Sequence, residues 1–133
     1  MDKIISTIWY TGGTSLRKQY PDYLFIHVCP DAVELNRAGH EVITTYRDPL
    51  RTAASWYNRH GKWISDTWRK QWIDWSLLSP ERIFKLDELT LHLNQYHDEH
   101  GLHKALDEDR MDYYHDLIPK EDIDFARERA NGS

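Results

Sequence analysis

The stretch EVITTYRDPLRTAASWYNR, residues 41–59, decides the fold expected for this chain. An apolar, β-branched run ends abruptly at Arg47-Asp48-Pro49, and an alanine-rich run follows. The first run predicts a strand over 41–46, because β-branched residues suit a pleated, buried surface. A proline in the first turn is typical of the start of a helix, and Gly61 is the expected stop. The stretch therefore predicts a strand that passes directly into a helix.

The same alternation of strand and helix runs along the chain. Further strands are predicted at 4–9, 23–29 and 82–86, with helices between them and a last helix at 119–130. The strands are apolar on both faces, as a parallel sheet covered by helices requires. We expect the α/β class, as a single three-layer domain over residues 1–133. Its sheet would be small and mainly parallel, with about four strands flanked by helices.

Composition excludes several classes of protein. The formal net charge of −5 gives no basic field for nucleic acid. The single cysteine, Cys29, excludes an internal disulfide. Neither a signal peptide nor a run as apolar as a membrane helix is recognisable, so we expect a cytoplasmic protein with no membrane partner. The sequence leaves open whether the chain forms a homo-oligomer.

A glycine turn follows the first predicted strand, in the sequence TGGTSLRK at 11–18. Gly12 and Gly13 would let backbone N–H groups face one point, while Thr14 and Ser15 add hydroxyl donors and the next helix adds its dipole. This arrangement suits a phosphate or a sulfate. The nucleotide-binding motif GxxxxGK[ST] is absent, and a glycine pair after a strand is also common as a plain tight turn.

Arg47 stands where the third predicted strand ends, and Ser55 follows about two helical turns later. A guanidinium at the carboxyl end of a strand offers a planar fork for phosphate oxygens. The alternative is that Arg47 pairs with a surface carboxylate and that Ser55 is a small residue for helix packing.

These residues carry a resemblance to the sulfotransferase family. In that family a strand ends in Arg-Asn/Asp-Pro and a serine follows eight residues after the arginine, as Ser55 follows Arg47. The family's first signature, Lys/Arg-x-Gly-Thr-Thr/Ser, is similar to residues 11–15, and His27 stands near the place of its catalytic histidine. The stretch RIFKLDELTLHLNQYHDEHGL, residues 82–102, resembles a later strand and helix of the family.

The resemblance implies a P-loop-type fold that binds 3′-phosphoadenosine 5′-phosphosulfate and transfers its sulfonate to a hydroxyl or amine. Thr14, Ser15 and backbone amides would hold the sulfonate and the 5′-phosphate, and Arg47 and Ser55 would hold the 3′-phosphate. His27 would take the acceptor's proton, although a histidine in an apolar strand is also common as a structural residue. The partners implied are this nucleotide and an acceptor of unknown class.

The chain departs from the family at Thr11, where a lysine or arginine is expected. Arg17 or Lys18 could substitute, since helix side chains lean toward the amino end. The family's late Arg-Lys-Gly segment is also missing. The alternative function is therefore a catalytically inactive relative that binds a nucleotide, or a protein partner through its tryptophan-rich helix. A small kinase is disfavoured by the missing Gly-Lys-Ser/Thr.

Tryptophans and histidines gather in two further stretches. We interpret five tryptophans as filling of a small core rather than as an acceptor pocket: Trp56, Trp63, Trp68, Trp72 and Trp75. Four histidines share no convincing set of metal-ligand spacings, so no metal site is predicted: His92, His97, His100 and His103.

Overall fold

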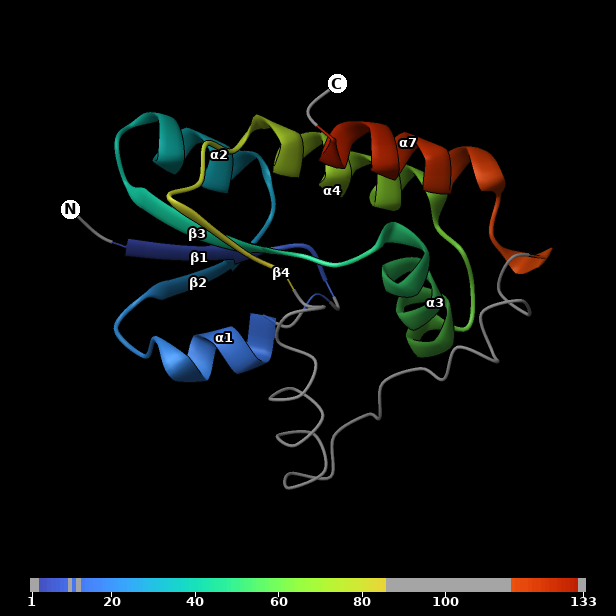
Figure 1. Cartoon of the computed structure of the whole chain (residues 1–133), viewed down its shortest axis with the longest axis horizontal. Helices are drawn as coiled ribbons and strands as arrows, with labels where there is room; N and C mark the ends of the chain where they lie inside the picture. Colours follow the sequence, from blue (N-terminus) through green and yellow to red (C-terminus); the bar gives the residue numbers. More distant parts are fainter. Residues whose placement is uncertain (1–2, 10, 12, 86–115, 132–133) are drawn as a thin grey trace.

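Four parallel strands form the sheet in the order β2-β1-β3-β4 (Figure 1). The computed structural model describes residues 3–9, 11, 13–85 and 116–131. The strands are β1 (Lys3–Thr7), β2 (Leu24–His27), β3 (Glu41–Tyr46) and β4 (Arg82–Lys85). The predicted α/β class and the parallel sheet are confirmed.

Helices cover both faces of this sheet. They are α1 (Gly13–Gln19), α2 (Pro30–Arg37), α3 (Pro49–His60), α4 (Ser65–Leu77) and α7 (Lys120–Ala130). Figure 1 shows α2, α4 and α7 on one face, α1 on the other, and α3 beyond the carboxyl ends of the strands. The helix predicted within 87–101 lies outside the described residues.

The boundaries of α3 follow from its end residues. The Asp48 carboxylate accepts hydrogen bonds from the backbone N–H of Leu50 at 3.1 Å and of Arg51 at 3.4 Å. These bonds satisfy amides that have no partner within the first turn. At the other end, Gly61 adopts a left-handed φ of 69°, which glycine takes without a Cβ clash. The Arg-Asp-Pro sequence thus forces the abrupt change from strand to helix.

Tryptophan rings fill the core under α4 and α7. Trp56, Trp68 and Trp72 are at most 2% exposed, and Trp75 is 9% exposed. The Trp75 indole N–H lies 3.1 Å from Thr44 Oγ1 and so ties α4 to β3. The core-filling interpretation is confirmed for these four rings. The four rings point into the molecule, and the alternative of a protein partner bound through the tryptophan-rich helix stays a prediction.

Asp122 on α7 joins the last helix to the rest of this core. Its carboxylate accepts hydrogen bonds from Trp63 Nε1 at 2.8 Å, Ser65 Oγ at 2.7 Å and Arg69 Nε at 2.6 Å. Burial alone would raise the pKa of Asp122, but these three donors and the charge of Arg69 outweigh it and lower the pKa. The side chain is therefore an ionised acceptor with three donors around it.

The opposite face of the sheet has a much smaller core. Ile5, Leu16 and Ile43 are buried there, with a few aromatic rings partly buried against them. Among the described residues, coverage is incomplete at the two edge strands. Leu24 on β2 is 54% exposed and Ile83 on β4 is 44% exposed.

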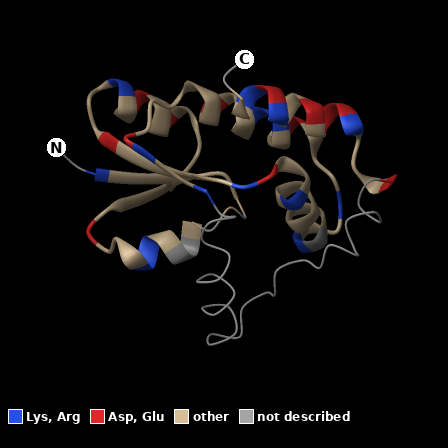
Figure 2. Cartoon of the chain, in the orientation of Figure 1, with Lys and Arg blue, Asp and Glu red and all other residues tan. Residues whose placement is uncertain are grey.

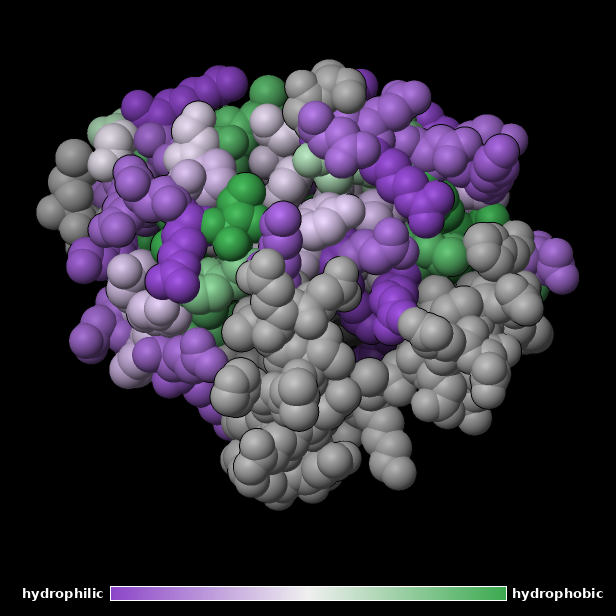
Figure 3. Space-filling model, in the orientation of Figure 1, coloured by the Kyte–Doolittle hydropathy of each residue, from purple (hydrophilic) through white to green (hydrophobic). Residues whose placement is uncertain are grey.

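The surface in Figure 3 is mainly hydrophilic over α7, and hydrophobic residues reach it in separate patches. Among the residues that the structure describes, no helix has the length and apolar character needed to cross a membrane.

Candidate functional site

The strand order places a topological switch point between β1 and β3. From the central strand β1 the chain moves to one side to form β2, and later to the other side to form β3. In open α/β sheets, ligands bind outside the carboxyl ends of the strands at such a point. The glycine turn follows β1 and Arg47 follows β3. Both predicted anion-binding segments therefore lie at the same edge of the sheet.

Arg47 and Ser55 meet in the structure. Arg47 Nη1 donates a hydrogen bond to Ser55 Oγ at 3.0 Å, across eight residues of sequence. Both side chains are half-buried. The sequence did not decide how α3 is rotated about its axis. In the structure its rotation brings Ser55 to the end of β3. A guanidinium and a hydroxyl lie together where the resemblance places the 3′-phosphate.

The backbone that carries Arg47 is held in place from α3. The Thr52 hydroxyl donates to the Asp48 carbonyl at 3.1 Å and approaches the Arg47 carbonyl at 3.4 Å. Thr52 is fully buried, so these contacts are shielded from water. Arg127 of α7 lies 3.6 Å from the Asp48 carboxylate. The start of α3 is therefore fixed by contacts on two sides.

Thr11 is a buried residue of the loop that follows β1. Its side chain is 0% exposed, and its hydroxyl lies 2.7 Å from Thr45 Oγ1 on β3 and 2.5 Å from the Ile8 carbonyl. The loop after β1 is thereby fastened to β3 two residues before Arg47. The position that the family gives to a cation holds a buried, hydrogen-bonded hydroxyl.

Gly13 is a point of close packing between α1 and the sheet. A Cβ at this position would lie 2.5 Å from Thr7 Oγ1 and 2.9 Å from the Phe25 ring. No other residue fits there without movement, so glycine allows α1 to approach β1 closely. Gly12, and the side chains of Thr14 and Ser15, lie outside what the structure describes, so their predicted contacts stay predictions.

His27 ends β2, on the far side of β1 from Arg47. Its imidazole meets the Phe25 ring edge-on at 5.0 Å between centroids and the Trp9 ring at 5.6 Å. The residue is exposed, but partial burial of the imidazole lowers the pKa of His27, while a hydrogen bond with the Thr7 backbone opposes this shift. A neutral imidazole at neutral pH suits a general base.

An aromatic group beside His27 was missed by the sequence reasoning. Trp9 stacks on Trp56 at 5.3 Å with an interplanar angle of 27°, and it lies 5.8 Å from the His60 ring. Trp9 is partly exposed at the mouth of the first loop. Its position as the last residue of the strand predicted at 4–9 was the available signal, but its partner on α3 is 47 residues later in sequence.

Charged residues are distributed differently on α1 and α7. Figure 2 shows basic and acidic residues mixed along α7, whereas α1 carries Arg17 and Lys18 and no acidic residue. Within the described part of the chain, no group of three His, Cys, Asp or Glu side chains could hold a metal ion. The four histidines between 92 and 103 lie outside that part.

Searches against protein-family models, curated proteins and solved structures found no match to the chain.

Proposed function

We propose that this chain binds 3′-phosphoadenosine 5′-phosphosulfate and transfers sulfonate to a hydroxyl or amine acceptor. The observation that carries the proposal is the 3.0 Å hydrogen bond between Arg47 and Ser55 beside the switch point. The motif that resembles the sulfotransferases requires these two side chains to act on one phosphate. Their contact is the arrangement that this role needs.

The residues at the end of β3 fit a phosphate by their chemistry. Arg47 contributes a planar, permanently charged donor, and Ser55 contributes a hydroxyl that can donate or accept. The link from Thr11 to Thr45 brings the loop after β1 against the same strand end. One bisphosphate nucleotide could therefore contact both segments. Its phosphosulfate form would supply the sulfonate group and leave as adenosine 3′,5′-bisphosphate, and the protein would supply positioning and charge stabilisation.

His27 has the properties of the base in this proposal. Its exposed imidazole would take a proton from the acceptor's hydroxyl or amine, and its lowered pKa keeps it unprotonated at neutral pH. Transfer should therefore slow as the pH falls through the pKa of His27, which lies below the ordinary value of 6.5. His27→Ala should abolish transfer of labelled sulfonate and leave nucleotide affinity nearly unchanged. Transfer at full rate would make His27 a structural residue.

The test of nucleotide binding is calorimetric titration with adenosine 3′,5′-bisphosphate and, separately, with ATP. We expect the bisphosphate to bind more tightly than ATP. Arg47→Ala should weaken its binding at least about tenfold, or about 1.4 kcal/mol, because a charge-assisted hydrogen bond to phosphate is lost. Arg59→Ala is the matched control, since it removes the same charge from an exposed position on α3, the helix that carries Ser55.

Absent or equal binding of the two nucleotides would overturn the proposal. An equal loss in Arg47→Ala and Arg59→Ala would show that only general charge attracts the ligand.

A second function is favoured by the burial of Thr11. A cation at this position would stabilise the leaving phosphate, and Thr11 offers a hydroxyl that is already engaged with Thr45. A catalytically inactive relative that binds the nucleotide would retain the Arg47–Ser55 contact and lack transfer. Tight binding of the bisphosphate without any transfer of labelled sulfonate would favour this function.

A further inference from the structure

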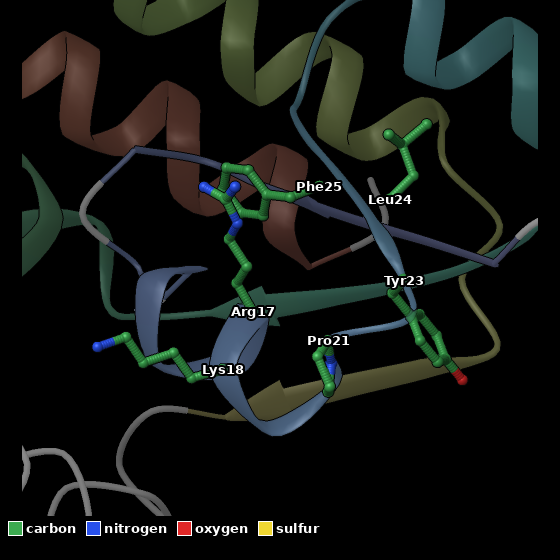
Figure 4. Close-up of a pocket in the computed structure, with 6 residues that line it drawn as sticks. All are labelled: Arg17, Lys18, Pro21, Tyr23, Leu24 and Phe25. Atoms are coloured by element: carbon green, nitrogen blue, oxygen red, sulfur yellow. The ribbon is translucent and has the colours of Figure 1, made fainter.

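Arg17 of α1 lies over the ring of Phe25 on β2. Its guanidinium carbon is 5.5 Å from the ring centroid, which is within range of a cation–π contact. Both residues line a groove of about 600 Å³ beside α1. Figure 4 shows the Arg17 guanidinium lying against the Phe25 ring. The contact thus holds an exposed cation at a defined place beside α1.

Phe25 also contacts the other parts of the candidate site. Its ring is 2.9 Å from the point that a Cβ would occupy at Gly13, and it packs edge-on against His27. The glycine turn, the proposed base and the Arg17 guanidinium therefore surround one ring. Since a phenyl ring in such contacts has little freedom, it defines where Arg17 stays relative to the loop.

A buried polar atom marks the same spot. Thr7 is 1% exposed, and its hydroxyl has no hydrogen-bond partner among the residues that the structure describes. This hydroxyl is the atom that a Cβ at Gly13 would meet at 2.5 Å. A buried hydroxyl without a partner costs about 1–3 kcal/mol, so its presence beneath the glycine turn needs a reason beyond packing. A site for a polar ligand at the turn would supply one.

We propose that Arg17, held on the Phe25 ring, is the cation that binds the 5′-phosphate end of the nucleotide in place of a basic residue at position 11. Phe25 is then a positioning residue that acts through Arg17. This inference rests on the proposed function, because it assigns one end of the same nucleotide.

Arg17 suits this role better than Lys18. A guanidinium presents a planar fork to phosphate oxygens and can stack on a ring at the same time, whereas an ammonium is a point charge. Figure 4 shows Lys18 extended away from the Phe25 ring. The two residues are adjacent and exposed on one helix, so Lys18 is a matched control for charge.

The test compares adenosine 3′,5′-bisphosphate with adenosine 3′-phosphate, which lacks the 5′-phosphate, by calorimetric titration. The affinity ratio of the two ligands measures the contribution of the 5′-phosphate. We expect Arg17→Ala to lower this ratio about tenfold and Lys18→Ala to change it less than about twofold. Arg47→Ala should weaken both ligands and leave the ratio unchanged.

Phe25 is tested by a double-mutant cycle. Phe25→Leu keeps an apolar side chain but removes the ring face, and we expect it to lower the same ratio about threefold. In the Arg17→Ala background, Phe25→Leu should have no further effect, whereas a purely structural residue would act equally in both. Melting temperatures of all variants identify any that fail to fold. If Arg17→Ala is among them, Arg17→Lys tests the stacking of the guanidinium on the Phe25 ring in a folded protein.

The outcomes separate the two proposals. If the wild type binds neither ligand, the proposed function fails. If it binds both, and Arg47→Ala weakens both while Arg17→Ala leaves the ratio unchanged, only the assignment of Arg17 is overturned. A drop in Lys18→Ala equal to that in Arg17→Ala would also overturn it.

Discussion

The two faces of the sheet differ in how many apolar residues they bury. The face under α2, α4 and α7 holds the large core, with four buried tryptophans and an ionised carboxylate that accepts three hydrogen bonds. The face under α1 buries three residues and presents Arg17 and Lys18 to solvent. A small domain that places most of its apolar burial on one face leaves the other available for charged residues.

The candidate site at the carboxyl edge contains residues from both faces of the sheet. Arg47 and Ser55 come from β3 and α3, and α3 packs into the large core through Ala53, Ala54 and Trp56. Gly13, Arg17 and Phe25 belong to the lightly packed face. The 3′-phosphate end of the proposed nucleotide would therefore contact residues that pack against the large core. Its 5′ end would contact residues of the lightly packed face. The following substitutions test this difference, from the largest expected effect to the smallest.

Asp122→Ala should destabilise the fold most. It leaves Trp63, Ser65 and Arg69 without their shared acceptor, and we expect a loss of about 3 kcal/mol in the free energy of unfolding. Urea denaturation with an unchanged m-value measures it. Asp124→Ala, at an exposed position on the same helix, is the control and should change stability by less than about 0.5 kcal/mol.

The pH dependence of Asp122 provides an independent check. Its folded pKa is lowered, so its contribution is complete above the unfolded value of 3.8 and is lost as the pH falls toward the lower folded pKa. The stability difference between wild type and Asp122→Asn should therefore shrink between pH 7 and pH 3. A difference that stays constant over this range would contradict the ionised, hydrogen-bonded state.

Gly13→Ala tests the lightly packed face. The new methyl group would meet Thr7 Oγ1 and the Phe25 ring, and overpacking of this kind costs about 1–3 kcal/mol. The same urea experiment measures it. Adding Thr7→Ala should restore part of the loss, because it removes the nearest atom. If Gly13→Ala is as stable as wild type, α1 is loose enough to move, and Arg17 is not fixed by its place on the helix.

Thr11→Val should have the smallest effect on stability. It preserves the shape of the side chain and removes the hydroxyl that links the β1 loop to Thr45, which we expect to cost about 1 kcal/mol. Thr11→Ser keeps the hydroxyl and is the control for its loss. An unchanged free energy of unfolding in Thr11→Val would mean that the contact between the loop and β3 contributes nothing to their association.

The sequence was most informative where local chemistry determines structure. Asp48, Pro49 and Gly61 predict the start and end of α3. The helix boundaries depend on neighbours within about two helical turns, whereas the meeting of Arg47 and Ser55 was left open by the sequence and is seen only in the structure. The same reasoning identified the tryptophan core, because the spacing of Trp68, Trp72 and Trp75 matches the helical period.

Long-range partners could not be predicted in this way. The burial of Thr11 depends on Thr45, and the orientation of Arg17 depends on the Phe25 ring of a neighbouring strand. No periodicity encodes such pairs, since strand order and register decide them. The resemblance suggested a missing cation at position 11. The structure adds that a lysine introduced there would enter a site with 0% exposure, where an unpaired charge is costly.

The bonds of Asp122 also affect the order in which the chain can become complete. They join α7 to donors that precede it by 53–59 residues. During synthesis from the amino terminus, the indole, hydroxyl and guanidinium donors leave the ribosome well before the carboxylate that accepts from them. Until residue 122 emerges, water must satisfy these groups, and the tryptophan face lacks its outermost helix. The nascent protein therefore has the residues of its proposed anion site before it can close its main core.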